Sequence, residues 1–207
     1  MVKAPRPPAT FTFDRESDLT VYDGPLWRIV RAAGEHPSTW DQLRRFGPVK
    51  GLRYDPWDTA PGLQDRGVMY AATDAVTAFA EVYQRPRSIT RAAGGATLAS
   101  WHPTRPLLLL DLTGTFMVRN GASASVSTGP KRFTQAWAAR FDQQLGGEID
   151  GLWHPSAMTA HPLVTLFERS VSVNSFPNRS EFHRALTDPL MNRLLARVAT
   201  ELSFQLR

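Results

Sequence analysis

The sequence of 207 residues contains no cysteine and no long hydrophobic run. Without cysteine the chain can form no disulfide, offers no thiolate nucleophile and holds no metal through sulfur, a composition that fits the cytoplasm. The longest apolar run, 106–112 (PLLLLDL), is far shorter than the roughly 20 residues that cross a membrane. The first 18 residues lack the apolar segment of a secretory signal. We therefore expect a cytoplasmic protein without a membrane anchor or a cleaved leader.

The common catalytic signatures are also missing from the sequence. It contains no P-loop, no GxGxxG after a strand, no HExxH and no GxSxG. His154 and His161 lie seven residues apart and could meet on a metal, but no neighbouring carboxylate completes a ligand set. We therefore expect two ordinary loop histidines and no metal site.

The amino-acid composition is typical of a globular protein with a basic surface. Hydrophobic residues make up 42% and charged residues 21% of the chain, so its length predicts one domain with a sizeable core. The formal net charge is +5 and the sequence pI is about 10.1. Such a surface attracts polyanions or phosphate-bearing ligands, although the basic residues are spread along the chain.

The order of predicted elements indicates an α+β protein without the regular alternation of a parallel sheet. Strands are predicted in six segments: 25–34, 67–72, 106–114, 149–155, 163–170 and 171–176. Helices are predicted in four segments: 38–47, 74–84, 129–147 and 181–206, the last with a break near Pro189. Residues 1–18 form a proline-rich arm, extended or poorly ordered until TFTF (10–13) or LTVY (19–22) pairs with another segment. Residues 19–207 form the single domain, in which 85–105 is predicted to be a loop or insertion.

The helix 74–84 offers a candidate catalytic carboxylate. Its buried stripe is predicted from residues at helical spacing: Val76, Phe79, Ala80 and Tyr83. Glu81 points away from the centre of this stripe, and its neighbours Thr77 and Ala78 are small. Glu81 is therefore either a solvated helix residue or a cleft residue that stabilises a cation or accepts a hydroxyl proton.

Three further residues have both a structural and a functional interpretation. Arg53, in GLRYDPW (51–57), either forms an ion pair with Asp55 or Asp58, or binds an anion. Tyr70 is either a core tyrosine with its hydroxyl at the rim or a ring that stacks on a ligand. Ser156 follows a strand and a proline, which indicates a turn or capping role, because local spacing places no base beside it.

The ordered segments resemble the RES domain, the toxin half of Xre-RES toxin–antitoxin systems. The matching segments span about residues 26–170: LWRI, GLRYDP, VMYAATDAVTAFAE, GLWHPSA and LVTLFERS. The family's arginine, glutamate and serine fall on Arg53, Glu81 and Ser156. Its tyrosine falls on Tyr70, and a further arginine motif falls on Arg28. Two positions depart from the arginine motif, where Leu52 replaces a glycine and Asp55 replaces an asparagine.

The resemblance implies an ADP-ribosyltransferase-like fold, with mixed or antiparallel sheets and flanking helices, and an enzyme that acts on NAD. NAD would be a consumed substrate, cleaved by hydrolysis or phosphorolysis, with no cofactor and no metal; ADP-ribosyl transfer to a protein is the alternative. Glu81 would stabilise the oxocarbenium-like state at the ribose. Arg53, helped by Arg28, would bind the pyrophosphate. Tyr70 would contact the nicotinamide, and Ser156 the ribose or carboxamide.

The resemblance also implies partners and one further hypothesis. An Xre-like helix-turn-helix antitoxin would cover the NAD cleft, and the family resemblance is also compatible with a homodimer. If Asp55 pairs with Arg53 in the free protein, then Asp55→Asn should tighten NAD binding.

Two non-enzymatic interpretations remain beside the enzyme. One is a RES-like scaffold that only binds a partner. The other is a nucleic-acid-binding module that uses basic residues from two regions: Arg85, Arg87, Arg91, Arg193 and Arg197. Little aromatic interleaving in 85–91 speaks against direct nucleic-acid binding.

Overall fold

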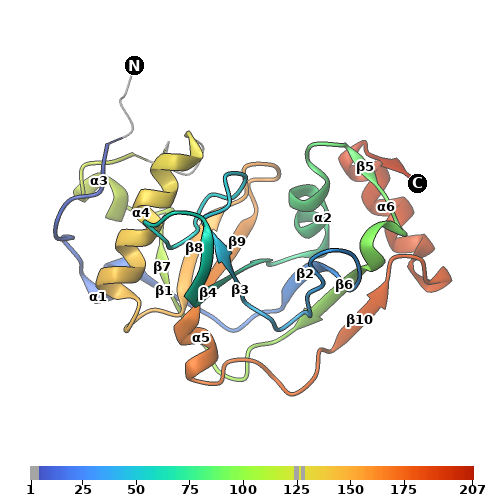
Figure 1. Ribbon diagram of the computed structural model, residues 1–207, viewed down its shortest axis with the longest axis horizontal. Coiled ribbons are helices and arrows are strands. Elements are labelled where there is room, and N and C mark those ends of the chain that lie inside the picture. The colour runs from blue at the N-terminus through green and yellow to red at the C-terminus, as the bar shows by residue number, and fades with distance from the viewer. Residues whose placement is uncertain (1–4, 124–125, 127–128) are drawn as a thin grey trace.

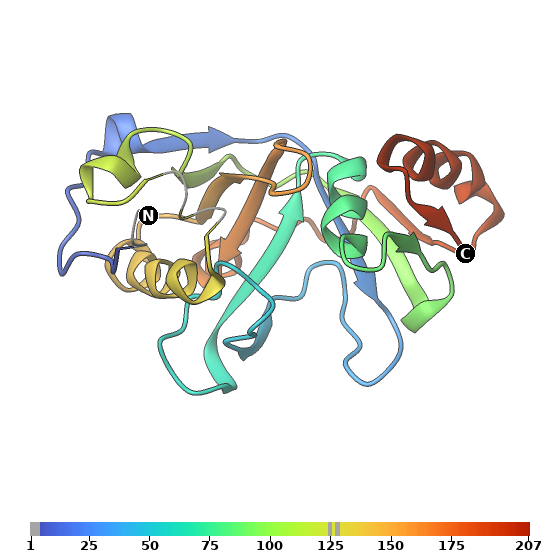
Figure 2. The same cartoon turned by 90° about the horizontal axis from the view of Figure 1, so that it is seen from above.

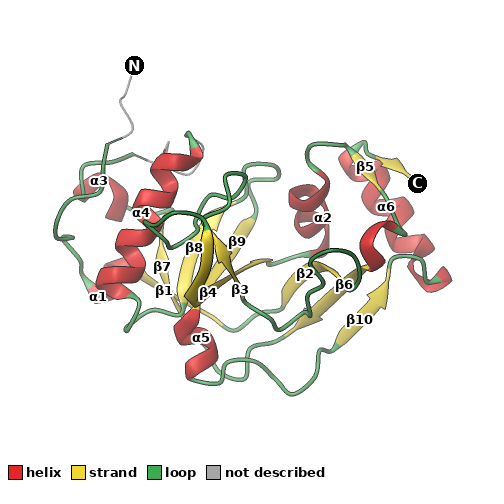
Figure 3. Ribbon diagram, viewed as in Figure 1, coloured by secondary structure: helices red, strands yellow, loops and turns green. Residues whose placement is uncertain are grey.

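The computed structural model describes residues 5–123, 126 and 129–207 and shows a mixed sheet flanked by helices (Figures 1 and 3). The helical elements, with 3-10 turns written η, are α1 (Arg15–Asp18), α2 (Ala75–Tyr83), η1 (Ala93–Gly95), α3 (Phe116–Arg119), α4 (Lys131–Leu145), α5 (Glu168–Ser172), η3 (Pro189–Met191) and α6 (Asn192–Leu202). The strands are β1 (Leu19–Tyr22), β2 (Leu26–Arg31), β3 (Arg44–Gly47), β4 (Gly62–Ala72), β5 (Ser88–Ile89), β6 (Ala96–Trp101), β7 (Leu107–Asp111), β8 (Gly151–Pro155), β9 (Pro162–Phe167), β10 (Phe182–Ala185) and β11 (Gln205–Leu206). The predicted α+β class is confirmed.

The main sheet runs in the order β1-β7-β8-β9-β4-β2-β6-β10, with β3 paired to β4. The pair β7–β8 is parallel, and the other pairs of this sheet are antiparallel. Two short strands, β5 and β11, form a separate parallel pair. Figure 1 shows α4 and α6 at opposite ends of the molecule.

The sheet opens between β2 and β4. We call this opening the β2–β4 junction. These strands share one residue pair, Trp27 with Ala72. By contrast, β4 pairs with β9 over 68–72, and β2 pairs with β6 over its whole length. Figure 2 shows the two strands spreading apart from their shared end. A space lined by backbone and side chains therefore forms between two well-paired halves of the sheet.

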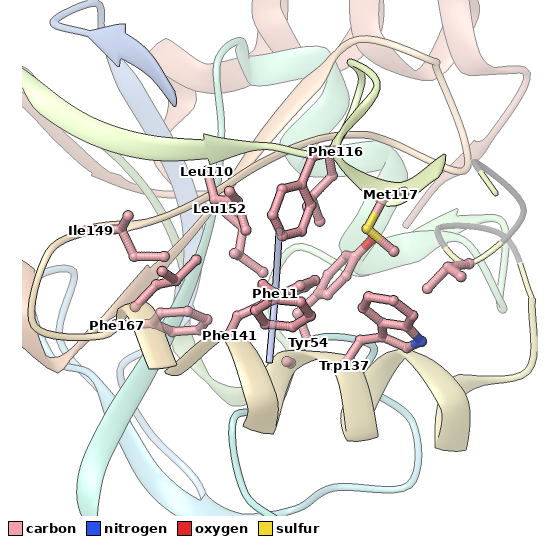
Figure 4. Close-up of a cluster of buried hydrophobic side chains, with 14 of the residues drawn as sticks. Phe11, Tyr54, Leu110, Phe116, Met117, Trp137, Phe141, Ile149, Leu152 and Phe167 are labelled. Atoms are coloured by element: carbon pink, nitrogen blue, oxygen red, sulfur yellow. The ribbon is translucent and has the colours of Figure 1, made fainter. Parts of the chain in front are cut away.

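Separate apolar clusters support the two halves. Trp137 and Phe141 of α4 are fully buried against the half that contains β7 and β8 (Figure 4). On the other half, Phe79 of α2 and Leu195 of α6 lie in one cluster with Leu98 of β6. Burial of such side chains stabilises each by about 1.5–3 kcal/mol. This packing places α2 beside the β2–β4 junction.

The predicted helix 38–47 is wrong. The segment contains turns and then β3, which pairs along the edge of β4. Trp40 and Leu43 are buried, but they lie in an irregular segment. Gly47 does not end a helix; a Cβ there would lie 2.1 Å from the ring of Trp57. Isolated short helices are marginal, and pairing with β4 satisfies this backbone instead.

The prediction of a loop or insertion over 85–105 is also wrong, because β6 is an internal strand paired on both sides. All six of its residues are buried. Small and hydroxylated side chains such as Ala99 and Ser100 gave the segment low hydrophobicity, which concealed a core strand. The predicted strand 171–176 is wrong as well, since α5 occupies 168–172 and turns follow.

The chain termini differ in part from their predictions. The predicted helix 181–206 begins with β10 and continues as α6 only after Pro189. At the other end, LTVY forms β1 on β7, and Phe11 of TFTF is buried against Trp137. Residues 1–4 of the predicted arm lie outside the described residues. No helix in the described part of the chain is long and apolar enough to cross a bilayer.

Candidate active site

A hollow of about 450 Å³ lies at the β2–β4 junction. This volume is within the range of about 300–1,000 Å³ that holds small molecules. Four of the predicted site residues line it: Arg28, Arg53, Tyr70 and Glu81. We call it the central hollow; its walls come from β2, β4, α2, the segment 51–54 and the end of β8. The fold therefore brings together residues that lie far apart in the sequence.

Glu81 is held in place by Ser156. The Ser156 Oγ donates to Glu81 Oε1 at 2.6 Å and accepts from the backbone N–H groups of Met158 at 3.0 Å and Thr159 at 3.2 Å. Ser156 is 4% exposed and lies behind the carboxylate, outside the residues that line the hollow. Because these bonds use the hydroxyl's proton and both lone pairs, Ser156 orients Glu81 in this geometry.

The turn that carries Ser156 is tied to the start of α2. Asp74 is the N-cap of α2 and accepts from the backbone N–H of Thr77 at 2.8 Å. The hydroxyls of Thr77 and Thr159 are 2.9 Å apart, and His161 Nδ1 lies 3.1 Å from Asp74 Oδ2. These contacts fix the position of the turn relative to the helix that presents Glu81.

Arg53 does not pair with the acids predicted for it. Its Nη1 donates to the carbonyl oxygen of Gly129 at 2.6 Å, which is a neutral acceptor, and no acid among the described residues forms an ion pair with it. Asp58 is exposed, and Asp55 forms its ion pair with Arg44. The structure therefore corrects the expected pair between Arg53 and Asp55.

Asp55 instead organises one wall of the central hollow. It is fully buried and accepts hydrogen bonds from Arg44 Nη2, from the backbone N–H of Val49 at 2.6 Å and from the hydroxyl of Tyr70 at 2.7 Å. The Tyr70 hydroxyl also accepts from the backbone N–H of Tyr54 at 3.1 Å. Burial, together with the nearby charge of Asp55, raises the pKa of Tyr70 well above its usual value. Tyr70 is thus a neutral phenol that lines the central hollow. The hydrogen bond from its hydroxyl to Asp55 was not predicted from the sequence.

Arg28 is positioned by backbone carbonyls on the opposite side of the junction. Its Nη1 donates to Gln42 at 2.8 Å and to Trp40 at 3.3 Å. Burial lowers the pKa of Arg28 to about 10, and repulsion from Arg44 acts in the same direction. The guanidinium remains charged at neutral pH, in a place where its charge is costly without an anion.

His154 and Lys131 line the central hollow and were not predicted as site residues. The His154 Nε2 lies 2.9 Å from the Thr165 hydroxyl, and burial lowers the pKa of His154 to about 4, so its ring is neutral. Lys131 donates from Nζ to the Gly51 carbonyl oxygen. No periodic signal could identify either residue, because the β8–β9 pairing and the start of α4 bring them to the site.

The prediction of an ordinary loop histidine is wrong for His154, which is a buried residue of β8, whereas His161 is an exposed residue outside the strands; the two have separate partners. His154 faces Thr165, whereas His161 faces Asp74. Among residues 5–123, 126 and 129–207 there is no group of three or more His, Cys, Asp or Glu residues arranged to hold a metal ion.

Comparison with known proteins identifies the family. Residues 25–184 match the model of the RES domain. Among solved structures, the chain is similar to the MbcT chain of the M. tuberculosis MbcT–MbcA toxin–antitoxin complex. The TM-score is 0.60 and the identity 18%, with 86% of this chain and 92% of that chain covered. No curated protein matches the chain. Because the family model covers more than half of the chain and the folds agree, the protein belongs to the RES domain family.

Proposed function

We propose that this protein is a RES-type toxin that cleaves the bond between nicotinamide and ribose in NAD. The observation that carries the proposal is the Glu81 carboxylate, fixed by Ser156 at 2.6 Å, on the wall of a hollow that also presents Arg28 and Arg53. A carboxylate beside cationic side chains suits a substrate that carries a diphosphate and develops positive charge at a sugar carbon.

The proposed reaction breaks the bond from C1′ of the ribose to the nicotinamide nitrogen. The electron pair of this bond leaves with nicotinamide, and the ribose becomes oxocarbenium-like. Glu81 stabilises that charge and accepts a hydrogen bond from a ribose hydroxyl. Water or phosphate then forms the new bond at C1′ and releases a proton to solvent. Arg53 and Arg28 bind the diphosphate, and the Tyr70 ring forms part of the wall beside the nicotinamide.

The toxin role includes a partner that covers the central hollow. We propose an Xre-like antitoxin with an acidic segment, because the hollow presents an excess of basic side chains. MbcT, which has the same fold, was solved together with an antitoxin. Expression of this chain alone should arrest bacterial growth, and coexpression of its antitoxin should restore growth; a homodimer would be visible by light scattering.

The nucleic-acid alternative has less support. Arg87 lies over the ring of Phe204 and donates to Leu202, and Arg91 donates from Nε to Leu186 at 2.8 Å. These arginines therefore hold the C-terminal elements in place and do not form an open basic stripe.

The decisive experiment follows free nicotinamide after purified protein is mixed with NAD, with and without phosphate. We expect release by the wild type and a loss on the order of 10²–10³ in rate for Glu81→Gln. Glu201→Gln, at an exposed position of α6, is the matched control and should retain full activity. Label that appears on protein would instead indicate ADP-ribosyl transfer.

A further inference from the structure

A second hollow of about 500 Å³ adjoins the first at the end of α2. It shares several lining residues with the central hollow, among them Glu81, Arg44 and Lys131. Its own wall adds Arg31 at the end of β2 and Arg85 just after α2. We call it the basic hollow. The two hollows therefore meet at Glu81.

Positive charge in the basic hollow is poorly compensated. The side chain of Arg85 forms no ion pair or hydrogen bond with any described residue. Burial lowers the pKa of Lys131, and repulsion from Arg53 and Arg85 lowers it further. The carboxylate of Glu81 acts in the opposite direction but is the weakest of these influences. Three cations thus crowd together around one acid, a pattern that favours binding of an additional anion.

The whole site holds more positive charge than NAD requires. Among the described residues, six basic side chains line the two hollows: Arg28, Arg31, Arg44, Arg53, Arg85 and Lys131. The acids beside them are Glu81 and the Arg44-bound Asp55. The diphosphate of NAD carries one negative charge on each phosphate. A phosphomonoester would add about −1.5 to −2 near neutral pH and would offset much of the charge that remains.

The basic hollow is built to recognise charge and not an aromatic base. Among its described lining residues the aromatic side chain is Tyr83, which is 1% exposed and packs on Phe79. An adenine ring therefore finds no exposed aromatic face there, whereas Arg85 and Arg31 can donate to phosphate oxygens.

We infer that the basic hollow binds a phosphomonoester, the 2′-phosphate of NADP, so that the site prefers the phosphorylated dinucleotide to NAD. This inference rests on the proposed function, which places the nicotinamide ribose at Glu81 and the diphosphate at Arg53 and Arg28; the adenosine ribose, which carries the 2′-phosphate, then lies toward the basic hollow. Arg85 is the specificity residue, and Arg31 and Lys131 assist it. Charge-assisted hydrogen bonds of this kind are expected to tighten binding by about 10- to 100-fold.

Calorimetric binding of ADP-ribose and of ADP-ribose 2′-phosphate tests the inference without requiring cleavage. We expect the wild type to bind the 2′-phosphate at least about tenfold more tightly. Arg85→Gln should reduce this preference to less than about threefold while leaving ADP-ribose affinity almost unchanged. Arg197→Gln, an exposed arginine of α6, is the matched control and should keep the preference.

Inorganic phosphate is another anion that could occupy the basic hollow, so its effect on ADP-ribose binding is measured separately. If excess phosphate tightens ADP-ribose binding through Arg85 while the 2′-phosphate adds nothing, the NADP assignment is overturned. Equal affinity for the two ligands, or no binding of either, overturns it as well. Cleavage of NAD without any such preference would leave the proposed function intact, whereas a preference without cleavage would refute the proposed function alone.

Discussion

Asp55 is the buried acid on which the wall of the central hollow depends. One of its oxygens accepts from both Arg44 and Tyr70, and the other accepts from Val49. An amide at this position could accept on one side only, so its NH₂ group would face a donor. Asp55→Asn should therefore weaken ADP-ribose binding, the opposite of the effect expected from a pair with Arg53. The loss of unfolding free energy should be about 3–5 kcal/mol, because Arg44 loses its charged partner.

Urea unfolding and calorimetry measure these two effects of Asp55→Asn. Asp58→Asn is the control, because Asp58 is exposed. Tighter binding in Asp55→Asn would show that Asp55 restrains Arg53 after all.

In the proposed reaction, Ser156 acts through Glu81, to which its hydroxyl donates. Ser156→Ala removes the donor to Glu81 and leaves the N–H groups of Met158 and Thr159 without their acceptor. We expect kcat to fall on the order of 10²-fold while KM changes little, because the carboxylate loses its orientation. The unfolding free energy should fall by about 1–3 kcal/mol.

Ser170→Ala is the matched control for Ser156→Ala. Ser170 is also buried and donates to the carbonyl oxygen of Phe167 at 2.7 Å, away from the site. It should lower stability by a similar amount and leave kcat unchanged. A raised KM with unchanged kcat in Ser156→Ala would mean that the hydroxyl contacts substrate directly.

His154 should make stability depend on pH. The folded protein holds its pKa at about 4, below the usual 6.5, so the unfolded chain binds the proton more readily. The neutral ring contributes fully to the unfolding free energy above pH 6.5, and this contribution is lost as pH falls toward 4. The loss is about 3 kcal/mol at most. Asp142, whose pKa burial raises to about 6, works in the opposite direction.

The contribution of His154 to the pH dependence of stability is therefore measured by comparing the wild type with a variant that lacks this histidine. His154→Gln should flatten the fall of unfolding free energy between neutral pH and pH 4 in urea titrations. His36→Gln is the control, because the His36 side chain is 89% exposed. An unchanged slope in His154→Gln would show that the ring is not held neutral.

At the scale of elements, the strong periodic signals led to correct predictions. The stripe on α2 places Phe79 and Tyr83 in the core and leaves Glu81 at the edge of that packing. The strands at 67–72 and 106–114 and the helix at 129–147 were also correct in type. Segments without a strong apolar signal were missed, because β3 and β6 form through their partners in the sheet and not through their own composition.

The N-terminal segment contributes more to the core than its proline-rich sequence predicts. Phe11 is 8% exposed and packs among three aromatic rings. Its ring centroid lies 5.3–5.8 Å from those of Phe116, Trp137 and Phe141. Phe11→Ala should therefore cost about 3–5 kcal/mol of unfolding free energy, measured by urea denaturation. Val21→Ala, at a 65% exposed position of β1, should cost far less. A cost below 1 kcal/mol for Phe11→Ala would mean that this segment does not stabilise the core.

At the scale of the whole molecule, the site is a product of topology. Single-residue pairing of β2 with β4 opens the sheet, and α2 and the segment 51–54 close two sides of the opening. Local sequence patterns contain no information on this register. The family resemblance placed Arg53, Glu81, Tyr70 and Arg28 in one site, and the structure shows them around one hollow. The anchoring by Asp55 and the second, basic hollow depend on long-range contacts, so only the structure could show them.

The central proposal is that Glu81, oriented by Ser156, promotes cleavage of the nicotinamide–ribose bond. The most direct test is the release of free nicotinamide from NAD by wild-type protein and by Glu81→Gln, compared with calorimetric binding of ADP-ribose to both. We expect release by the wild type, a loss on the order of 10²–10³ in Glu81→Gln, and binding retained in both. No release by the folded, ligand-binding wild type, or equal release by Glu81→Gln, would contradict the claim.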